Sequence, residues 1–216
     1  MTTDLMSQRQ ALVDASLQAV ALRLSTGTAG NISLRHGDGM LITPTGIDPG
    51  EMRAEQIVAV DLDGNWSGSW KPSSEWSIHA QIYRNTDAQA VVHAHPDYCV
   101  ALACLRQPLP PFHYMVAGFG GNEVPCARYE PFGSLALADA VLEALGSRYN
   151  ACLMANHGIT TFGADLRGAL RRAERLETLA RQYLLARAAG EPVLLTPADL
   201  SEVHGRYATY GKQPKG

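Results

Sequence analysis

The stretch Ala90-Val91-Val92-His93-Ala94-His95-Pro96 combines the pattern of a buried strand with two regularly spaced histidines. A short apolar run that ends at a proline is typical of a strand inside a sheet. Side chains two residues apart on a strand project from the same face, so His93 and His95 place two imidazoles side by side. This spacing indicates a metal-chelating pair. Two histidines that are hydrogen-bonded in a core remain the alternative on spacing alone.

His157 is the candidate for a third ligand. It lies in Asn156-His157-Gly158, a turn between two apolar strand-like runs at 151–154 and 159–162, where a side chain can point into a cleft. Three histidines leave a zinc ion one open coordination position, which is the arrangement of a catalytic site. The other four histidines lie on predicted helices, in a turn or in irregular sequence, which favours surface or core roles: His36, His79, His113 and His204.

Glu75 follows two serines at the start of a helix predicted over 73–83. A carboxylate there has a structural explanation in the helix dipole, and Ser73 or Ser74 is placed to cap the helix. The same helix start offers hydroxyls and free backbone N–H groups, which together make an anion site. A base beside an anion site and a metal would be catalytic machinery, so both interpretations of Glu75 stay open here.

Two glycine-bearing loops can add amide donors for a phosphate. They read Thr26-Gly27-Thr28-Ala29-Gly30-Asn31 and Thr43-Pro44-Thr45-Gly46. Each loop is a weak signal alone, because Gly, Thr and Pro also build ordinary turns. Neither matches the dinucleotide fingerprint or the Walker loop, which disfavours nucleotide chemistry.

The bulk composition favours one compact domain, because 216 residues with 46% hydrophobic content can bury a sizeable core. The formal net charge of −3 lacks the basic excess of a nucleic-acid binder. Apolar runs fall far below the roughly 20 residues that span a bilayer, and the four cysteines form no C-x-x-C pair. We therefore expect a cytoplasmic protein that binds a small molecule, with neither nucleic acid nor membrane as a partner.

Apolar spacing and turn signals predict helices at about 5–24, 73–83, 96–105, 133–145 and 166–189, with a last one that begins at Thr196-Pro197. They predict strands at about 32–34, 40–42, 57–61, 90–95, 151–154 and 159–162. These elements do not alternate as regularly as in a parallel doubly wound sheet. We expect an α/β fold with a single-domain, three-layer α/β/α architecture around a central mixed, largely antiparallel sheet. The domain spans 1–216, with a mobile C-terminal tail at about 205–216.

The loops, the Ser-Ser-Glu helix start and the histidines together resemble the class II aldolase/adducin family over nearly the whole chain. The resemblance rests on the two loops and on Pro72-Ser73-Ser74-Glu75-Trp76, Val91-Val92-His93-Ala94-His95, His113-Tyr114-Met115, Gly120-Gly121-Asn122, Asn156-His157-Gly158 and Thr209-Tyr210-Gly211. In combination these motifs are highly specific.

The resemblance implies that His93, His95 and His157 bind one zinc ion per subunit, which agrees with the spacing. It assigns Glu75 as the catalytic acid/base and Tyr114 as a second catalytic residue that reaches the site of a neighbouring subunit. A cyclic homotetramer with active sites at subunit interfaces follows from that role. The residues implied in substrate and phosphate binding are Gly30, Asn31, Thr45, Gly46, Ser73, Ser74 and Tyr210.

The implied activity is zinc-dependent, reversible aldol cleavage of a ketose 1-phosphate similar to L-fuculose 1-phosphate, giving dihydroxyacetone phosphate and an aldehyde such as lactaldehyde. The alternatives are a pentulose-phosphate epimerase, a methylthioribulose-1-phosphate dehydratase, a decarboxylase and a non-catalytic adducin-like module. The intact zinc ligands and Glu75 disfavour the module, and the Tyr114 segment favours aldol cleavage. Asn156 departs from the family member that the sequence most resembles, which has histidine there; the natural aldehyde stays open.

Overall fold

The described residues of the chain form one seven-stranded sheet, in the order β3-β2-β1-β4-β7-β6-β5. The computed structural model describes residues 2–207, 209 and 210. The strands are β1 Asn31–His36, β2 Gly39–Ile42, β3 Val58–Asp61, β4 Ala90–Ala94, β5 Cys126–Ala127, β6 Ala151–Met154 and β7 Gly158–Gly163. Within the described chain only β5 and β6 pair in parallel, so the expected mixed, largely antiparallel sheet is confirmed.

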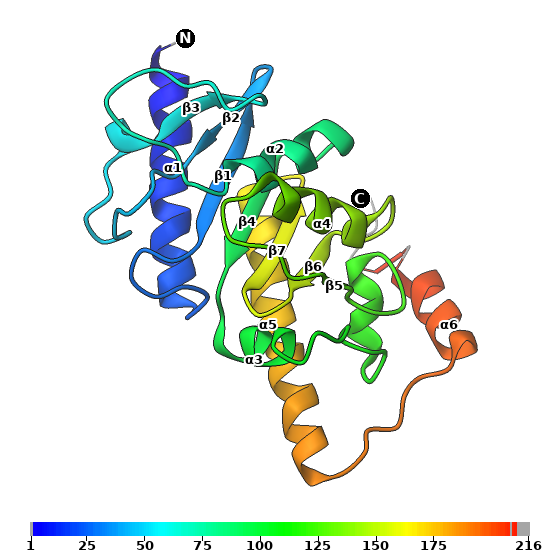
Figure 1. Ribbon diagram of the computed structural model, residues 1–216. Helices are drawn as coiled ribbons and strands as arrows, with labels where there is room; N and C mark the ends of the chain where they lie inside the picture. Colours follow the sequence, from blue (N-terminus) through cyan, green and yellow to red (C-terminus); the bar gives the residue numbers. More distant parts are fainter. Residues whose placement is uncertain (1, 208, 211–216) are drawn as a thin grey trace.

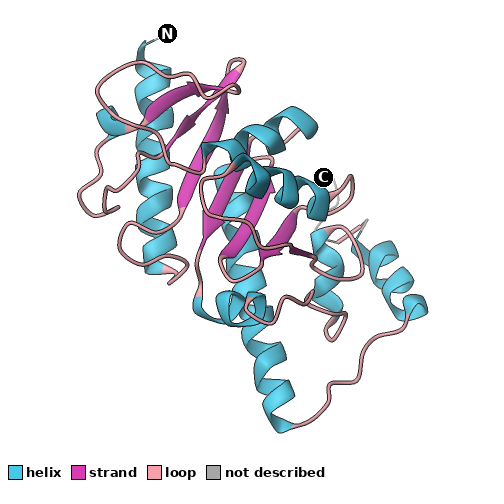
Figure 2. Cartoon of the chain, in the orientation of Figure 1, coloured by secondary structure: helices cyan, strands magenta, loops and turns pink. Residues whose placement is uncertain are grey.

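Helices cover both faces of this sheet. They are α1 Thr2–Ala21, η1 Ala54–Gln56, α2 Trp76–Asn85, α3 Asp97–Ala103, η2 Tyr114–Phe119, α4 Leu135–Leu145, α5 Leu166–Ala189 and α6 Pro197–Tyr207. Helices α2 and α4 pack on one face, and α1, α3 and α5 lie on the other (Figure 1). Figure 2 shows the strands enclosed between the two helix layers, which confirms the three-layer architecture. Helix α6 packs against η2, away from the sheet.

Strand β4 is buried on both faces, and its alternation sets up the site. Ala90, Val92 and Ala94 belong to the apolar core on the α1 and α5 side, whereas Val91 belongs to the core beneath α2 and α4. Because side chains alternate along a strand, His93 shares the face of Val91 and points toward the layer of α2. Burying each of the two valines contributes about 1.5–3 kcal/mol, which keeps the strand in this register.

The structure changes one expectation at the end of a helix, and a second falls mostly outside the described residues. The predicted cap by Ser73 or Ser74 is wrong: α2 begins at Trp76 with Glu75 as its N-cap residue, and the Ser73 hydroxyl accepts the N–H of Glu75 instead. The tail expected at about 205–216 lies mostly outside the described residues, because 208 and 211–216 are not described and α6 runs to Tyr207. Among the described helices, none has the length and apolar character needed to cross a membrane.

Candidate active site

Two loops join to form one wall of a pocket at the ends of β1 and β4. The N–H of Thr45 donates to the carbonyl of Lys71 at 3.1 Å, and the N–H of Ser73 donates to the carbonyl of Thr43 at 3.1 Å. These bonds hold segment 43–46 beside segment 73–75. The pocket has a volume of about 140 Å³. Six residues that were expected to bind substrate line it: Gly30, Asn31, Thr45, Gly46, Ser73 and Ser74.

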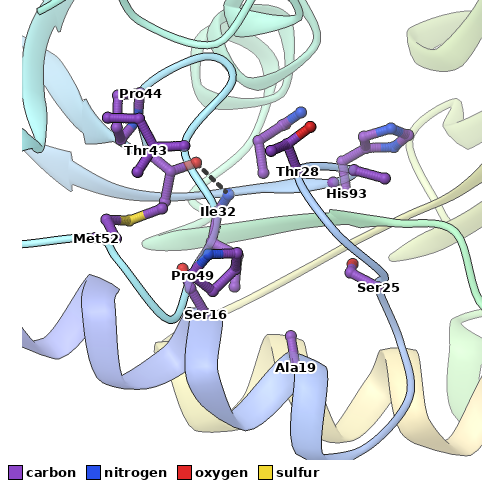
Figure 3. Close-up of a pocket in the computed structure, with 14 residues that line it drawn as sticks. Ser16, Ala19, Ser25, Thr28, Ile32, Thr43, Pro44, Pro49, Met52 and His93 are labelled. Atoms are coloured by element: carbon purple, nitrogen blue, oxygen red, sulfur yellow. Dashed lines mark hydrogen bonds between the residues drawn. The ribbon is translucent and has the colours of Figure 1, made fainter.

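A second cavity shares residues 28–31 with this pocket and lies against α1 (Figure 3). Small side chains of α1, Ser16 and Ala19, line its floor, and its volume is about 20 Å³. That is room for about one water molecule. A sugar phosphate does not fit there, so the larger pocket is the candidate substrate site.

Gly30 allows the first loop to cross β4 closely. Its φ of +83° lies in the left-handed region, and a Cβ there would come within 2.6 Å of Ser25 Oγ and 2.9 Å of the His93 carbonyl oxygen. Any residue with a side chain at position 30 would therefore displace the start of β1. The glycine thus keeps Asn31 directly opposite His93, its partner in the β1–β4 ladder.

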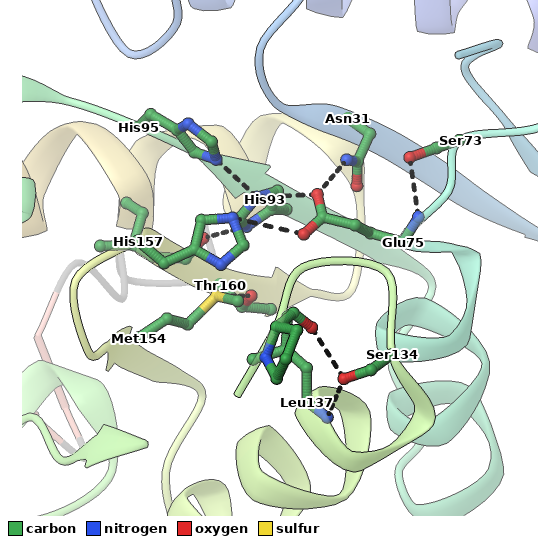
Figure 4. Close-up of polar contacts among 12 residues, drawn as sticks. Asn31, Ser73, Glu75, His93, His95, Ser134, Leu137, Met154, His157 and Thr160 are labelled. Carbon is green, nitrogen blue, oxygen red and sulfur yellow. Dashed lines mark hydrogen bonds and ion pairs between the residues drawn. The ribbon is translucent and has the colours of Figure 1, made fainter. Parts of the chain in front are cut away.

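Three histidines converge on one point at the edge of the pocket. His93 comes from β4, His95 follows the end of that strand, and His157 lies in the turn between β6 and β7 (Figure 4). Their ring centroids are 4.7, 4.9 and 4.9 Å apart, and the rings stand nearly perpendicular to one another. The candidate ligand atoms of these rings and of Glu75 all lie within 4.8 Å of one another. The predicted trio is therefore assembled in a cluster that can hold a metal ion.

The turn that carries His157 depends on its two neighbours. A Cβ on Gly158 would lie 2.4 Å from the Ala94 carbonyl oxygen and 2.8 Å from Cδ2 of His95, so only glycine lets the turn approach β4. Asn156 has a φ of +54°, a left-handed conformation that asparagine tolerates better than most residues. Nε of Arg106 donates to Asn156 Oδ1 at 2.7 Å and fixes the turn from outside.

The protonation of the histidines suits a metal ligand set. Nδ1 of His93 lies 2.9 Å from the carbonyl oxygen of Ile159, which can only accept, so Nδ1 carries the hydrogen and a neutral ring keeps its lone pair on Nε2. Burial, reinforced by the neighbouring His93, lowers the pKa of His95 to about 3 and that of His157 to about 4. Both rings are neutral near pH 7, with lone pairs free for a cation. The donor set fits a zinc ion or a similar metal.

Glu75 lies beside the histidines with its two oxygens in different surroundings. Oε2 accepts from Asn31 Nδ2 at 3.0 Å and lies 3.1 Å from His93 Nε2 (Figure 4). Oε1 lies 3.3 Å from His157 Nε2 but accepts no hydrogen bond from the described residues, although it is buried. The side chain makes no cap bond to α2, so it serves the cluster rather than the helix end.

The ionisation of Glu75 follows from the same contacts. Burial favours the neutral acid, but His93, His157 and the Asn31 hydrogen bond favour the carboxylate and together lower the pKa below its usual range. A buried carboxylate with one oxygen held and one oxygen free is arranged to exchange a proton with a bound molecule. This arrangement favours the catalytic interpretation of Glu75.

Two predicted residues lie elsewhere, and one was missed. Tyr114, at the start of η2, and Tyr210 are 51% and 82% exposed, and neither lines the pocket of its own chain as far as the structure describes it. Phe132 lines the pocket although it is 77% exposed. Nothing in the sequence around Phe132 sets it apart, because its place depends on how the β5–α4 connection crosses the pocket.

Comparison with known proteins matches this geometry. Residues 10–184 match the family described as Class II Aldolase and Adducin N-terminal domain. The chain is 43% identical over 204 residues to a 5-methylthioribulose-1-phosphate/5-deoxyribulose-1-phosphate aldolase of Rhodospirillum rubrum, with 94% of this chain and 92% of the relative covered. It is 42% identical over 202 residues to an L-fuculose phosphate aldolase of Escherichia coli O6:H1, with 93% and 94% covered.

A solved structure of an L-fuculose 1-phosphate aldolase superposes with a TM-score of 0.89 at 37% identity, covering 94% of this chain and 96% of that chain. The chain therefore belongs to the class II aldolase/adducin family, as the motifs predicted. Within it, the chain is a class II aldolase, a metal-dependent aldehyde-lyase.

Proposed function

We propose that the chain catalyses the reversible aldol cleavage of a ketose 1-phosphate to dihydroxyacetone phosphate and a small aldehyde. The observation that carries this proposal is the free Oε1 of Glu75, which lies in one pocket with the histidine cluster and the glycine loops. A base, a metal site and an anion site in one pocket are the three parts that such a reaction needs. A scaffold without chemistry has no use for a buried carboxylate whose oxygen lacks a partner.

The phosphate site is formed by hydroxyl and amide donors. Ser73, Ser74 and Thr45 supply hydroxyls, and the loop backbones at Gly30 and Gly46 supply N–H groups. The Asn31 amide carries two hydrogens, so it can contact Glu75 and a phosphate oxygen together.

We propose zinc as the metal, one ion per subunit, held by His93, His95 and His157. Neutral imidazoles are typical zinc ligands, and three of them leave a coordination position for the substrate. When bound, zinc supplies a Lewis acid that polarises a carbonyl and stabilises the negative charge that develops beside it. Oε1 of Glu75 returns a proton to the carbon next to the carbonyl during cleavage and removes that proton during synthesis, while the Asn31 amide holds Oε2.

We also propose that the active site is completed by a second copy of the chain in a cyclic homotetramer. Tyr114 is exposed and lies outside its own pocket, which suits a side chain that reaches a neighbour and exchanges a proton with the aldehyde oxygen. Tyr210 would contribute to substrate binding from the C-terminal segment. The four cysteines are free, which supports the proposed cytoplasmic location.

Two kinds of ketose phosphate stand first as substrates, because one relative is named for L-fuculose phosphate and another for 5-methylthioribulose 1-phosphate and 5-deoxyribulose 1-phosphate. The test is a panel of ketose 1-phosphates of both kinds, incubated with zinc-loaded enzyme and with chelator-treated enzyme, with dihydroxyacetone phosphate as the readout. Release that needs the metal supports the proposal. An isomeric pentulose phosphate, a dehydrated product or carbon dioxide without dihydroxyacetone phosphate would indicate the epimerase, dehydratase or decarboxylase instead.

A further inference from the structure

A buried chain of polar side chains leads from Glu75 to Tyr83, across the packing of α2 on β1. Asn31 Nδ2 lies 3.0 Å from Glu75 Oε2, and Asn31 Oδ1 lies 2.6 Å from His79 Nε2. Nδ1 of His79 lies 2.7 Å from Ser33 Oγ, which lies 2.7 Å from the Tyr83 hydroxyl. All five side chains are at most 7% exposed. The five groups therefore form one continuous chain inside the protein.

The chain arises from two matching periodicities. Glu75, His79 and Tyr83 are spaced four residues apart at the start of α2 and along one of its faces, and Asn31 and Ser33 are spaced two apart on one face of β1. Four residues of a helix rise about 6 Å and two residues of a strand rise about 6.6 Å. The helix face and the strand face thus keep in step, so each polar group meets the next.

Every hydrogen bond in this chain points toward Glu75. The ionised carboxylate can only accept, so Asn31 presents its N–H to Oε2 and its oxygen to His79. Nε2 of His79 must then donate, which leaves Nδ1 of the neutral ring as an acceptor for the Ser33 hydroxyl. Ser33 in turn accepts from Tyr83. Burial supports these assignments, because it lowers the pKa of His79 to about 3 and raises that of Tyr83.

The far end of the chain is fixed by Arg35. Its guanidinium lies 4.8 Å from the centroid of the Tyr83 ring, and Nη2 donates to the Tyr83 carbonyl oxygen at 2.7 Å. The ring and backbone of Tyr83 are therefore held by a third side chain of β1. The near end of this chain is Glu75, the carboxylate that lines the pocket among the described residues, so the buried polar groups connect to the site rather than only to one another.

We propose that His79 is a positioning residue for Glu75. In a single tautomer, with Nε2 donating to Asn31 and Nδ1 accepting from Ser33, it orients the Asn31 amide so that Oε2 is held and Oε1 is left as the oxygen that moves the proton. This inference rests on the proposed proton-transfer role of Glu75. Its consequence is that His79 and Ser33, which lie behind Asn31 in the protein interior, affect turnover without contacting the substrate or the metal.

The test compares two substitutions at one position. Glutamine at 79 can place an amide N–H where Nε2 of the ring lies, whereas leucine removes the donor and keeps a similar size. We expect His79→Leu to lower kcat about 10- to 100-fold, with KM and zinc content changed less than about threefold, and His79→Gln to recover most of that loss. The second measurement is the nitrogen NMR spectrum of full-length protein labelled with ¹⁵N-histidine, with and without zinc.

The spectrum is expected to show His79 neutral, with its proton on Nε2, from about pH 6 to pH 8 in both forms. Ser33→Ala removes the hydroxyl that donates to Nδ1, so it is expected to leave the proton on Nε2 but to hold the ring less firmly and to lower kcat. A proton on Nδ1 in the unaltered protein, or equal loss of kcat in the glutamine and leucine variants, would overturn the proposal. Failure of the unaltered enzyme to cleave any ketose phosphate would instead contradict the proposed function, and the NMR result would still decide the tautomer.

Discussion

Nδ1 of His93 donates to the carbonyl oxygen of Ile159 at 2.9 Å, so the backbone of β7 aims a side chain of β4 at the metal site. The bond fixes both the tautomer and the ring plane, and it leaves Nε2 pointing at His95, His157 and Glu75. In the same antiparallel ladder, Thr160 lies opposite His93 and Ile159 lies opposite Ala94. The sheet itself therefore positions the first of the three proposed ligands.

Removal of one ligand is expected to abolish metal binding. His95→Ala leaves two imidazoles, so we expect zinc affinity to fall at least about 100-fold and the zinc content after dialysis to approach zero. The measurement is metal content by atomic emission together with a competition titration. His204→Ala, at an exposed histidine on α6, is the matched control and is expected to keep its zinc. Full zinc content in the His95 variant would contradict the ligand assignment.

Gly158 is expected to tolerate no side chain. Alanine would place its Cβ against the Ala94 carbonyl and the His95 ring, so Gly158→Ala should cost on the order of 2 kcal/mol in the free energy of unfolding. It should also weaken zinc binding, because the His157 turn must shift. Denaturant unfolding and a zinc titration measure both effects. Gly205→Ala, where a Cβ meets nothing within 4 Å, is the control and should leave both properties nearly unchanged or slightly improved.

The three clustered histidines could be predicted from the sequence, because their placement depends on local patterns of a few residues. Strand alternation places His93 and His95 on one face, and the turn Asn156-His157-Gly158 lies between two recognisable strands. The strands predicted at about 32–34 and 40–42 also form, and they pair with His36 opposite Gly39. In each case the relevant contacts lie within a few residues of the pattern that predicts them.

Other features depend on tertiary contacts that no local pattern reports. Strand β5 has only two residues, Cys126 and Ala127, and exists because they pair with β6. Glu75 turns from the helix end toward the histidines because the Asn31 amide donates to its side chain. His79 was predicted to have a surface or core role, and it lies in the core with no exposed surface. Its link to Glu75 runs through Asn31, which is 48 residues away in the chain.

The buried His79 is expected to make stability fall at acid pH. Its pKa is about 3 in the folded protein against 6.5 as the reference value, so its contribution is complete above about pH 6.5 and is lost as the pH falls toward 3. The loss amounts to on the order of 3 kcal/mol between about pH 7 and pH 4. His79→Gln should flatten this pH dependence by that amount, whatever its stability at neutral pH.

Denaturant unfolding at several pH values measures how the free energy of unfolding changes with pH in the variant and in the unaltered protein. Both proteins are treated with chelator, so that His95 and His157 contribute equally to the two. An identical slope in the variant and the unaltered protein would show that His79 is not buried as a neutral ring.

Mixed assemblies are expected to show whether Tyr114 acts in a neighbouring subunit. His95→Ala and Tyr114→Phe subunits should each be nearly inactive alone, but their co-refolded mixture should recover up to about a quarter of the unaltered activity, because some sites draw an intact residue from each chain. A mixture of His95→Ala with Glu75→Gln is the control. Both of those residues lie in the pocket of one chain. Every subunit in that mixture lacks one of them, so no site is intact and no activity should be recovered. No gain in the Tyr114 mixture would contradict the shared site.

The most direct test of the account is hydrogen exchange on dihydroxyacetone phosphate in deuterated water, with zinc-loaded enzyme and no aldehyde. We predict that one hydrogen on the carbon beside the carbonyl exchanges, and that Glu75→Gln slows this exchange about 1,000-fold or more while zinc content stays intact. Glu143→Gln, at an exposed carboxylate of α4, should exchange at the normal rate. Exchange at the normal rate in the Glu75 variant would contradict the account, because the proton would then be moved by another group.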